Sequence, residues 1–301
     1  MFKRKNTTIN FEGNEIRFLV VKGDDIRSWH TLKIPPEYMV QGQISKTTEI
    51  GNLISKTVKK LKGSRRNVIT SVTGQRSLHR IMTIPNIQDK LLEETIRRKT
   101  KQEFAIPLDE TDIHWRILSR SNSQLILYVL AVPKIIVDSQ MAALKAAKIK
   151  PRMIDIKPLA LQRMVNQSTS IIVNLESFSL DVIVSINHIP ILVRSVPLET
   201  GNLSEEAKLD LLSQELARTV KYYNESNKTN RLPENTAVFL TGELFDKSPL
   251  STRLDEKADL GERLKTRTPF SVKYPKGPYP VPENFSVSKY AVNLGLSLKS
   301  R

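Results

Sequence analysis

Apolar and polar residues alternate over residues 7–34, TTINFEGNEIRFLVVKGDDIRSWHTLKI. Gly13 and the Gly23-Asp24-Asp25 group interrupt the alternation at two points, where turns are expected. A period of two with turn residues between the runs is typical of consecutive antiparallel strands. The pattern therefore predicts a meander of three strands. Residues 171–197, IIVNLESFSLDVIVSINHIPILVRSVP, show the same order of strand, turn, strand, turn and strand.

The two meanders share a short sequence pattern. Residues 9–16, INFEGNEI, and residues 173–180, VNLESFSL, both read hydrophobe-Asn-hydrophobe-Glu, then three loop residues and a returning hydrophobe. Each is followed by a second turn and by a third strand that ends before a proline. A long-spaced repeat of a whole supersecondary unit indicates two related lobes.

Helical periodicity dominates between the meanders and after the second one. Helices are predicted at 45–62, 87–104, 133–149, 157–167, 204–226 and 288–298, and short strands at 67–72, 77–84, 152–156 and 236–242. Residues 246–286 show little pattern. Two lobes in which helices alternate with strands predict an α/β fold of the duplicated ribonuclease H-like kind, with a cleft between the lobes.

The composition describes a basic protein without cysteine. The 301 residues include 47 Lys and Arg against 31 Asp and Glu, a formal net charge of +16. This balance favours nucleic acid, an anionic membrane surface or an acidic partner. The lack of cysteine excludes disulfides, thiolate metal sites and cysteine nucleophiles. No signal peptide is expected, and the most apolar window, 125–132, is too short to span a bilayer, so we expect a soluble, cytoplasmic protein.

Few side chains show a recognisable catalytic or metal-binding pattern. There is no P-loop and no G-x-S-x-G motif. The acidic group Asp109, Glu110 and Asp112 is interpreted as a solvated loop. Four histidines lack metal-ligand spacing and are expected in surface or hydrogen-bonded roles: His30, His79, His114 and His188.

A basic run at residues 56–66, KTVKKLKGSRR, has three interpretations. It is a solvated helix end, a patch for an anionic membrane surface, or a nucleic-acid contact. Single-strand binders interleave aromatic residues for base stacking, and this run has none. The solvated helix end is the simplest interpretation, and the membrane surface ranks before nucleic acid.

Longer blocks of the sequence resemble a known family. Residues 68–110 run from a strand through a helix into AIPLDE, and residues 127–161 run from LYVLAVP to DIKPLAL. QELARTVKYYNES (214–226), VFLTGE (238–243) and YAVNLGLSLKS (290–300) follow in order. In order and spacing, these blocks resemble the PilM family, the actin-like cytoplasmic proteins of type IV pilus assembly, which are similar to the division protein FtsA.

The resemblance implies an actin-like fold with a small FtsA-type subdomain inserted in the first lobe. It divides the chain into a first-lobe core at 1–76, the inserted subdomain at 77–145, a connection back to the first lobe at 146–169, a second-lobe core at 170–203 and 236–301, and a reduced helical subdomain at 204–235.

The resemblance also places three nucleotide loops. In the family, both phosphate loops open with Asp, then Ile or Leu, then Gly, and the adenosine loop reads Thr-Gly-Gly. The matching positions here are Asn10, Phe11 and Glu12, followed by Gly13, in the first loop; Asn174, Leu175 and Glu176, followed by Ser177, in the second; and Thr241, Gly242 and Glu243 in the third.

These substitutions change the chemistry of a nucleotide site. Asparagine keeps an oxygen ligand but has no charge and cannot act as a base. Glutamate replaces a glycine that lets backbone N–H groups approach phosphate, and like charges about 4 Å apart repel by roughly 1 kcal/mol in water. We expect no ATP hydrolysis, no metal site and no required cofactor. Binding of ATP with Mg²⁺ by an active actin-like ATPase is the alternative, and a shifted register at Gly13 would favour it.

The resemblance implies a protein partner. In PilM proteins, a groove between the first subdomain and the inserted one binds the N-terminal tail of the membrane protein PilN. The matching groove walls here are residues 67–84, 87–104 and 112–131. The implied location is cytoplasmic, peripheral at the inner membrane and next to its anionic surface. Homo-oligomers are a further kind of partner, and a basic nucleic-acid-binding module is the remaining alternative.

Overall fold

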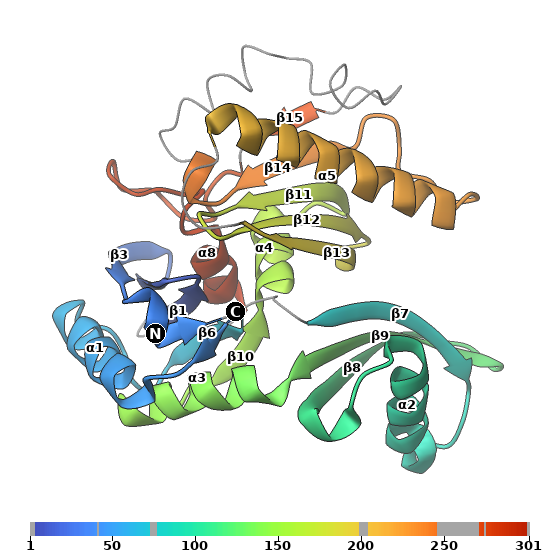
Figure 1. Cartoon of the computed structure of the whole chain (residues 1–301), viewed down its shortest axis with the longest axis horizontal. Helices are drawn as coiled ribbons and strands as arrows, with labels where there is room; N and C mark the ends of the chain where they lie inside the picture. The colour runs from blue at the N-terminus through green and yellow to red at the C-terminus, as the bar shows by residue number, and fades with distance from the viewer. Residues whose placement is uncertain are drawn as a thin grey trace.

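The computed structural model describes residues 4–40, 42–72, 77–198, 204–245, 271–273 and 275–299. Two five-stranded sheets form the centres of two lobes, and a separate three-stranded sheet lies beside the first lobe. Figure 1 shows the first lobe at the lower left, the three-stranded sheet at the lower right and the second lobe above them.

The first lobe is built on the first predicted meander. The meander strands β1 (Lys5–Glu12), β2 (Glu15–Lys22) and β3 (Asp25–Lys33) pair antiparallel, and β6 (Val68–Val72) and β10 (Met153–Ile156) continue the sheet in parallel beyond β1. The strand β2 is buried on both faces. Ile16 and Phe18 lie in the core beneath the helices of this lobe, whereas Leu19 and Val21 lie in the core between the lobes.

The second lobe repeats this topology. Its strands are β11 (Thr169–Leu175), β12 (Ser179–Ile186), β13 (Ile189–Pro197), β14 (Ala237–Thr241) and β15 (Ser271–Lys273). The sheet orders β10-β6-β1-β2-β3 and β15-β14-β11-β12-β13 match strand for strand, with the same parallel and antiparallel pairs. Even the β-bulge recurs, between Val20 and Val21 and between Val184 and Ser185. The predicted α/β fold with two related lobes is confirmed.

The three-stranded sheet forms a small subdomain. Its strands β7 (Leu78–Pro85), β9 (Gln124–Pro133) and β8 (Thr111–Arg120) pair in that order, and α2 (Asp89–Phe104) packs on one face. Leu92 and Ile96 of α2 are buried against the sheet because they lie on the apolar face of the helix. A short 3₁₀ turn, η2 (Leu108–Glu110), connects the helix to β8.

Two helices cover the outer face of the first lobe. The helix α1 (Thr47–Lys60) crosses α3 (Lys134–Ala146), and a Cβ on Gly51 would lie 2.5 Å from the Cβ of Ala146. Ala143 and Leu144 of α3 belong to the core of the first lobe. By packing, α3 therefore belongs to this lobe, although the sequence-based boundary at residue 145 assigns it to the inserted subdomain. We propose that the inserted subdomain ends near Pro133.

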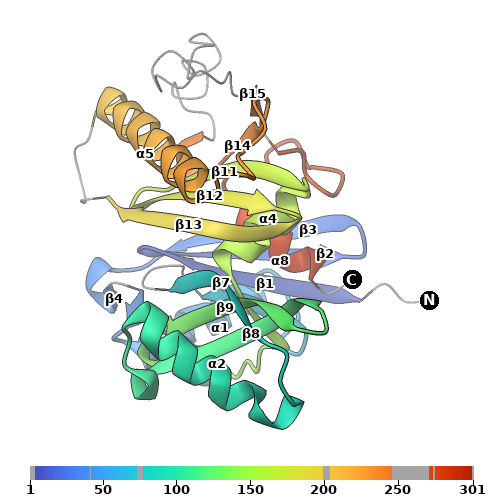
Figure 2. The same cartoon turned by 90° about the vertical axis from the view of Figure 1, so that its right-hand side faces the viewer.

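The helices α4 (Lys157–Val165) and α8 (Ala291–Leu298) lie between the two sheets, as Figure 2 shows. Their backbones touch, since a Cβ on Gly295 would lie 1.9 Å from the carbonyl oxygen of Ala160. Asn293 of α8 donates to Thr8 and to the Arg17 carbonyl in the first sheet. The C-terminal helix thus packs on the first lobe, although the predicted second-lobe core at 236–301 includes it.

The helix α5 (Glu205–Ser226) covers the second sheet through Leu212, Leu216 and Val220. Ser204 caps its start by accepting a hydrogen bond from the Ala207 N–H. The short elements are η1 (Pro36–Tyr38), β4 (Met39–Val40), β5 (Gln43–Ile44) and η3 (Glu243–Phe245).

In the part of the chain that the structure describes, no helix is both long and apolar enough to cross a membrane. The predicted boundaries at residues 76 and 203, and residues 246–270 of the pattern-poor stretch, lie outside the described residues.

Candidate functional site

The two predicted phosphate loops meet between the lobes, at the ends of β1 and β11. Their asparagines have equivalent partners, because Asn10 Oδ1 accepts from Ser71 Oγ at 2.7 Å and Asn174 Oδ1 accepts from Thr241 Oγ1 at 3.0 Å. Both asparagines are buried, and neither Nδ2 atom has a hydrogen-bond partner among the described residues. Each oxygen thus accepts a hydrogen bond, and neither side chain offers a cation the negative charge that an aspartate would.

Glu176, at the glycine position of the second loop, binds Arg17 of the first lobe. Arg17 Nη1 donates to Glu176 Oε1 at 2.9 Å, and Nη2 donates to Oε2 at 2.7 Å. Glu15 and Glu243 each place a carboxylate oxygen 3.3 Å from Arg17 Nη2. Burial acts to lower the pKa of Arg17, but the charge of Glu176 and its hydrogen bond outweigh burial and raise the pKa. The guanidinium is therefore held between two lobes as a permanent cation.

Glu12, at the glycine position of the first loop, forms the second interlobe cluster. Lys157 Nζ lies 2.7 Å from Glu12 Oε2 and 3.0 Å from Asp181 Oδ2 of the second lobe. Ser179 of the second lobe also donates to Glu12 Oε1, at 3.2 Å. Burial raises the pKa of Glu12 to about 6, and Lys157 opposes this rise. Burial acts to lower the pKa of Lys157, but Asp181 and Glu12 raise it overall.

The two clusters follow from the internal repeat. Asn10 faces Arg17 across the first hairpin, and Asn174 faces Asp181 across the second. Arg17 pairs directly with the glutamate of the opposite lobe. The residue equivalent to Arg17 in the second lobe is Asp181, which carries the same charge as Glu12. Lys157 of α4 lies between these two anions and pairs with both. Glu176 is thereby neutralised by a cation of the opposite lobe, and Glu12 by a cation of the helix between the two sheets.

The tips of the two hairpins also touch. Gly13 has a positive φ of +54°, and a Cβ there would lie 2.3 Å from Cδ2 of Phe178. The aromatic ring from the second hairpin therefore covers the glycine whose backbone a shifted register would offer to phosphate. The structure does not support that alternative for the first loop.

The third predicted loop is tied to the second. A Cβ on Gly242, which has a φ of +108°, would lie 2.2 Å from the carbonyl oxygen of Leu175. The Glu243 carboxylate accepts hydrogen bonds from the Ser177 backbone N–H and hydroxyl, and Lys289 Nζ lies 3.1 Å from it. Burial acts to raise the pKa of Glu243, but the Ser177 hydrogen bond and Arg17 lower it overall. The structure thus brings the three predicted loops together.

The residues at this position do not fit a nucleotide with Mg²⁺. The side chains of Glu12 and Glu176 stand where family glycines leave room, and Phe178 covers Gly13. No group of three or more His, Asp or Glu side chains in the described ranges could hold a metal ion. The arrangement instead joins two lobes through buried ion pairs.

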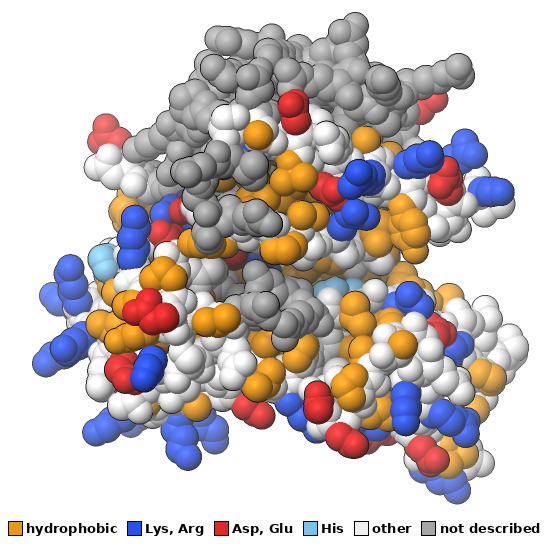
Figure 3. Space-filling model, viewed as in Figure 1, with side chains coloured by type: hydrophobic (Ala, Val, Ile, Leu, Met, Phe, Trp, Pro, Cys, Tyr) orange, Lys and Arg blue, Asp and Glu red, His pale blue; other side chains and the backbone are white. Residues whose placement is uncertain are grey.

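A cavity of about 730 Å³ lies between the inserted subdomain and the start of α3. Its apolar wall includes Leu78, Ile106 and Ile135, and its acidic wall includes Asp109, Glu110 and Asp138. Hydrophobic side chains gather between the lower lobe and the inserted subdomain in Figure 3. The volume is within the range of about 300–1,000 Å³ that is common for ligand pockets.

The sequence identified the walls of this groove in part. Leu78 and Ala131 come from predicted walls, but no described residue of α2 lines the cavity. The start of α3 is not among the predicted walls, and Asp109 and Glu110 belong to the loop that the sequence predicts to be solvated. Ile135 is aliphatic but 51% exposed, and this exposure marks the start of α3 as a wall of the cavity.

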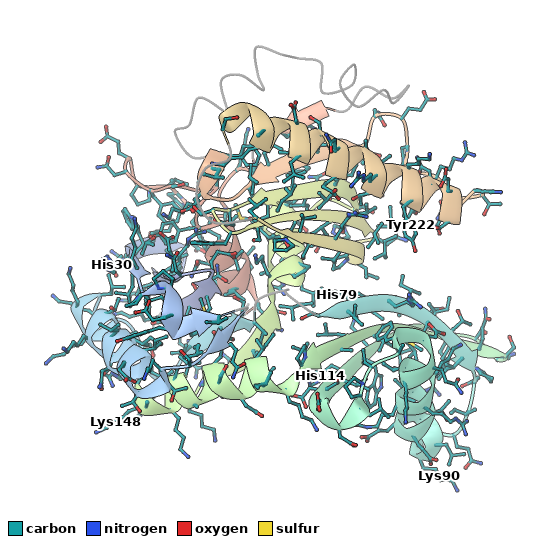
Figure 4. All side chains as sticks on the ribbon, in the orientation of Figure 1. His30, His79, Lys90, His114, Lys148 and Tyr222 are labelled. Carbon is teal, nitrogen blue, oxygen red and sulfur yellow. The ribbon has the colours of Figure 1, made fainter. Side chains whose placement is uncertain are left out.

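The histidines do not form a site. Figure 4 shows His30 on the first lobe and His79 and His114 on the inserted subdomain, where they lie on β7 and β8 on either side of Leu130. His79 Nδ1 lies 2.8 Å from Tyr128 Oη, and burial lowers the pKa of His79 to about 4. His188 Nδ1 lies 3.2 Å from Gln162 Nε2.

Comparison with known proteins identifies the family. A family model described as "Type IV pilus assembly protein PilM" matches residues 22–196, which is more than half of the chain. The chain belongs to the PilM family. The family resemblance drawn from the sequence is thus confirmed, whereas no curated protein matches the chain.

Solved structures of similar fold agree. A PilM–PilN type IV pilus biogenesis complex matches with a TM-score of 0.79 and 17% identity, covering 99% of this chain and 98% of that one. The cytoplasmic domain of EpsL, an inner-membrane component of the Vibrio cholerae type II secretion system, gives a TM-score of 0.54, with 11% identity and coverage of 99% and 94%. The ethanolamine utilization protein EutJ from Carboxydothermus hydrogenoformans gives 0.53, with 9% identity and coverage of 99% and 90%. The PilM-family chain therefore has the predicted actin-like fold.

Proposed function

We propose that the protein is a non-catalytic adaptor of a type IV pilus assembly platform, which binds the N-terminal tail of a PilN-like inner-membrane protein. The observation that carries this proposal is the pair of interlobe ion clusters, Arg17 with Glu176 and Lys157 with Glu12 and Asp181. In an actin-like ATPase, this position must open to admit a nucleotide. Here it is closed by charges that compensate one another, so the two lobes act as one scaffold.

The groove between the inserted subdomain and α3 is the proposed docking site for the tail. Leu78 and Ile135 are exposed by 39% and 51%, which is unusual for aliphatic side chains on two adjoining walls. Asp109, Glu110 and Asp138 make the rim acidic in a chain whose net charge is +16. A peptide with an apolar anchor and a basic residue beside it matches both walls. The similarity to a PilM–PilN complex supports a partner of this kind.

Binding of such a tail would place the protein at the cytoplasmic face of the inner membrane. The tail of a single-span membrane protein is short, so its partner lies close to the anionic lipid surface. We propose a peripheral location there, with the whole chain on the cytoplasmic side. We also propose that the adaptor self-associates. Light scattering of the chain with and without the peptide measures its molar mass in solution.

The test is fluorescence anisotropy of a labelled peptide that corresponds to the N-terminal tail of a PilN-like inner-membrane protein. Ile135→Asp and Leu78→Asp place a charge on the apolar wall, and Val281→Asp changes an equally exposed aliphatic residue outside it. We expect the groove variants to weaken binding by at least 10-fold and the control to bind as the parent does. No binding by the parent, or equal binding by all variants, would reject the groove as the docking site.

A further inference from the structure

A second cavity, of about 530 Å³, lies on the first lobe and is lined by basic side chains. We refer to it as the basic cleft, formed by Lys5, Lys22, Arg27, Lys60 and Lys62 around the apolar residues Val20 and Leu61. None of the described residues that line it is acidic. Lys60 and Lys62 of the cleft belong to the basic run at residues 56–66, for which the sequence allows three interpretations.

The fold brings these cations together from four segments, of which β3 contributes Arg27. Lys60 ends α1, and Lys62 follows with a positive φ of 51°, which turns the chain at the helix end. Lys5 begins β1, and Lys22 ends β2 beside the turn into β3. Basic residues at a helix C-terminus offset the helix dipole, which explains one or two lysines at the end of α1 but not the strand residues opposite.

Some of the basic residues in this region are engaged in structural contacts. Lys5 Nζ donates to the Lys62 carbonyl at 2.9 Å. Arg65 donates hydrogen bonds to the Ala147 carbonyl and to the carbonyl and hydroxyl oxygens of Ser55. Arg27 lies 2.8 Å from Asp25, with both side chains about half exposed. These contacts leave a smaller set of cations for a ligand.

Lys22, Lys60 and Lys62 make up that set. All three are exposed, and their side chains form no hydrogen bond or ion pair with the rest of the described chain. Burial lowers the pKa of His30, and the positive charge of nearby Lys60 lowers it further. Three unpaired ammonium groups around one concavity form a natural site for an oxyanion with several acceptor oxygens.

We propose that the basic cleft binds the phosphate of anionic phospholipid headgroups at the membrane surface. Arg4 and Lys59 precede the cleft residues Lys5 and Lys60 along the chain and are also exposed, so basic side chains are not confined to the cleft, which suits a charged surface better than one soluble phosphate. Nucleic acid is less well matched, since none of the described residues that line the cleft is aromatic and could stack on a base. Val20 and Leu61 give the cleft an apolar floor that the aliphatic lysine stems extend.

The test is co-sedimentation of the full chain with vesicles of phosphatidylglycerol and phosphatidylcholine, and with phosphatidylcholine alone. The test variant is Lys22→Gln/Lys60→Gln/Lys62→Gln. The matched control, Lys90→Gln/Lys101→Gln/Lys228→Gln, removes the same charge from exposed positions elsewhere. Figure 4 shows Lys90 at the far end of the inserted subdomain from His30, which adjoins the cleft. At about 1 kcal/mol per basic residue, we expect roughly 100-fold weaker binding for the test variant and little change for the control.

Three results would overturn the assignment. Equal losses in both variants would mean that net charge, not the cleft, drives binding. Lysine-dependent binding of soluble glycerol phosphate as tight as vesicle binding would make the ligand a free phosphate. Tighter lysine-dependent binding of a single-stranded oligonucleotide than of vesicles would make it nucleic acid. Equal urea midpoints for parent and variants confirm that folding is unaffected.

This inference deepens the proposed peripheral location and is separable from the proposed tail binding. The tail peptide is titrated into the same variants in solution without lipid. Intact peptide binding with no vesicle binding by the parent rejects the lipid site alone. Vesicle binding without peptide binding rejects the adaptor proposal and leaves the lipid site standing.

Discussion

Arg17 of β2 and Glu176 after β11 form a two-point ion pair across the lobes, with N–O distances of 2.9 and 2.7 Å. Both side chains are 1% exposed. Glu176 occupies the position of a glycine that contacts phosphate in the family pattern. The residue expected to repel a nucleotide is thus also a residue that joins the lobes.

Replacing Arg17 by Met leaves the buried carboxylate of Glu176 without its cation, whereas Lys289 still lies 3.5 Å from Glu15 and 3.1 Å from Glu243. We expect this variant to lose about 3–5 kcal/mol of unfolding free energy, because an uncompensated buried charge is costly. Glu176→Met should cost less, since Glu15 and Glu243 remain 3.3 Å from Arg17. The double variant should lose clearly less than the sum. Urea unfolding of the four proteins measures this coupling, and additive losses would show that the pair does not act as a unit.

Glu12→Gln should change how stability depends on pH. Burial raises the pKa of Glu12 from 4.5 to about 6, so the folded state takes up a proton more readily than the unfolded state. The resulting stabilisation is fully present below pH 4.5 and is lost as pH rises through 6. Relative to Glu12→Gln, the parent should therefore lose about 2 kcal/mol between pH 4 and pH 7. Urea unfolding of both proteins across this range measures the difference, in which groups that do not interact with Glu12 cancel; a constant difference would contradict the buried carboxyl.

Gly13→Ala tests the contact between the hairpin tips. The added Cβ would lie 2.3 Å from the Phe178 ring, at a φ of +54°. We expect a loss of about 1–3 kcal/mol, of which the αL conformation accounts for roughly 1. Adding Phe178→Ala removes the steric clash but not the backbone strain. The extra cost of Gly13→Ala should therefore be smaller in a Phe178→Ala background, and an unchanged cost would place the ring away from Gly13 in solution.

The sign of the stability change caused by Gly295→Ala shows whether helix propensity or helix packing dominates at this position. In an isolated helix, alanine is more favourable than glycine by about 1 kcal/mol. Here the Cβ would lie 1.9 Å from the Ala160 carbonyl, so α4 and α8 must separate. We expect lower thermal stability by about 1–3 kcal/mol. A stabilised variant in thermal unfolding would mean that the two helices do not cross so closely.

The topology was predictable because it is encoded locally. Alternation and turn residues mark both meanders, and the shared Asn and Glu positions of residues 9–16 and 173–180 indicate the duplication. A strand's side-chain period is a property of a few consecutive residues, so the sequence alone contains it.

The ion clusters were not predictable in this way. Lys157 lies 145 positions from Glu12, and Arg17 lies 159 positions from Glu176. No periodic pattern links such residues, and nothing in the sequence separates Lys157 from the other residues of its predicted helix. The sequence therefore suggested that the glutamates would repel phosphate, but not that cations from other segments compensate them.

The groove was predictable only in outline. The family resemblance indicated its place, but it included α2, whose Leu92 and Ile96 face the subdomain core instead. Whether an amphipathic helix turns its apolar face to a sheet or to an open wall depends on the packing of distant elements. Ile135 of α3 could have been assigned to either from its spacing alone.

The central claim is that the interlobe position holds ion pairs and not a nucleotide. Isothermal titration calorimetry of ATP into the full chain, with and without Mg²⁺, measures this most directly. The account predicts no saturable binding up to about 1 mM ATP, which corresponds to an affinity weaker than about −4 kcal/mol. A micromolar dissociation constant that depends on Mg²⁺ would contradict it.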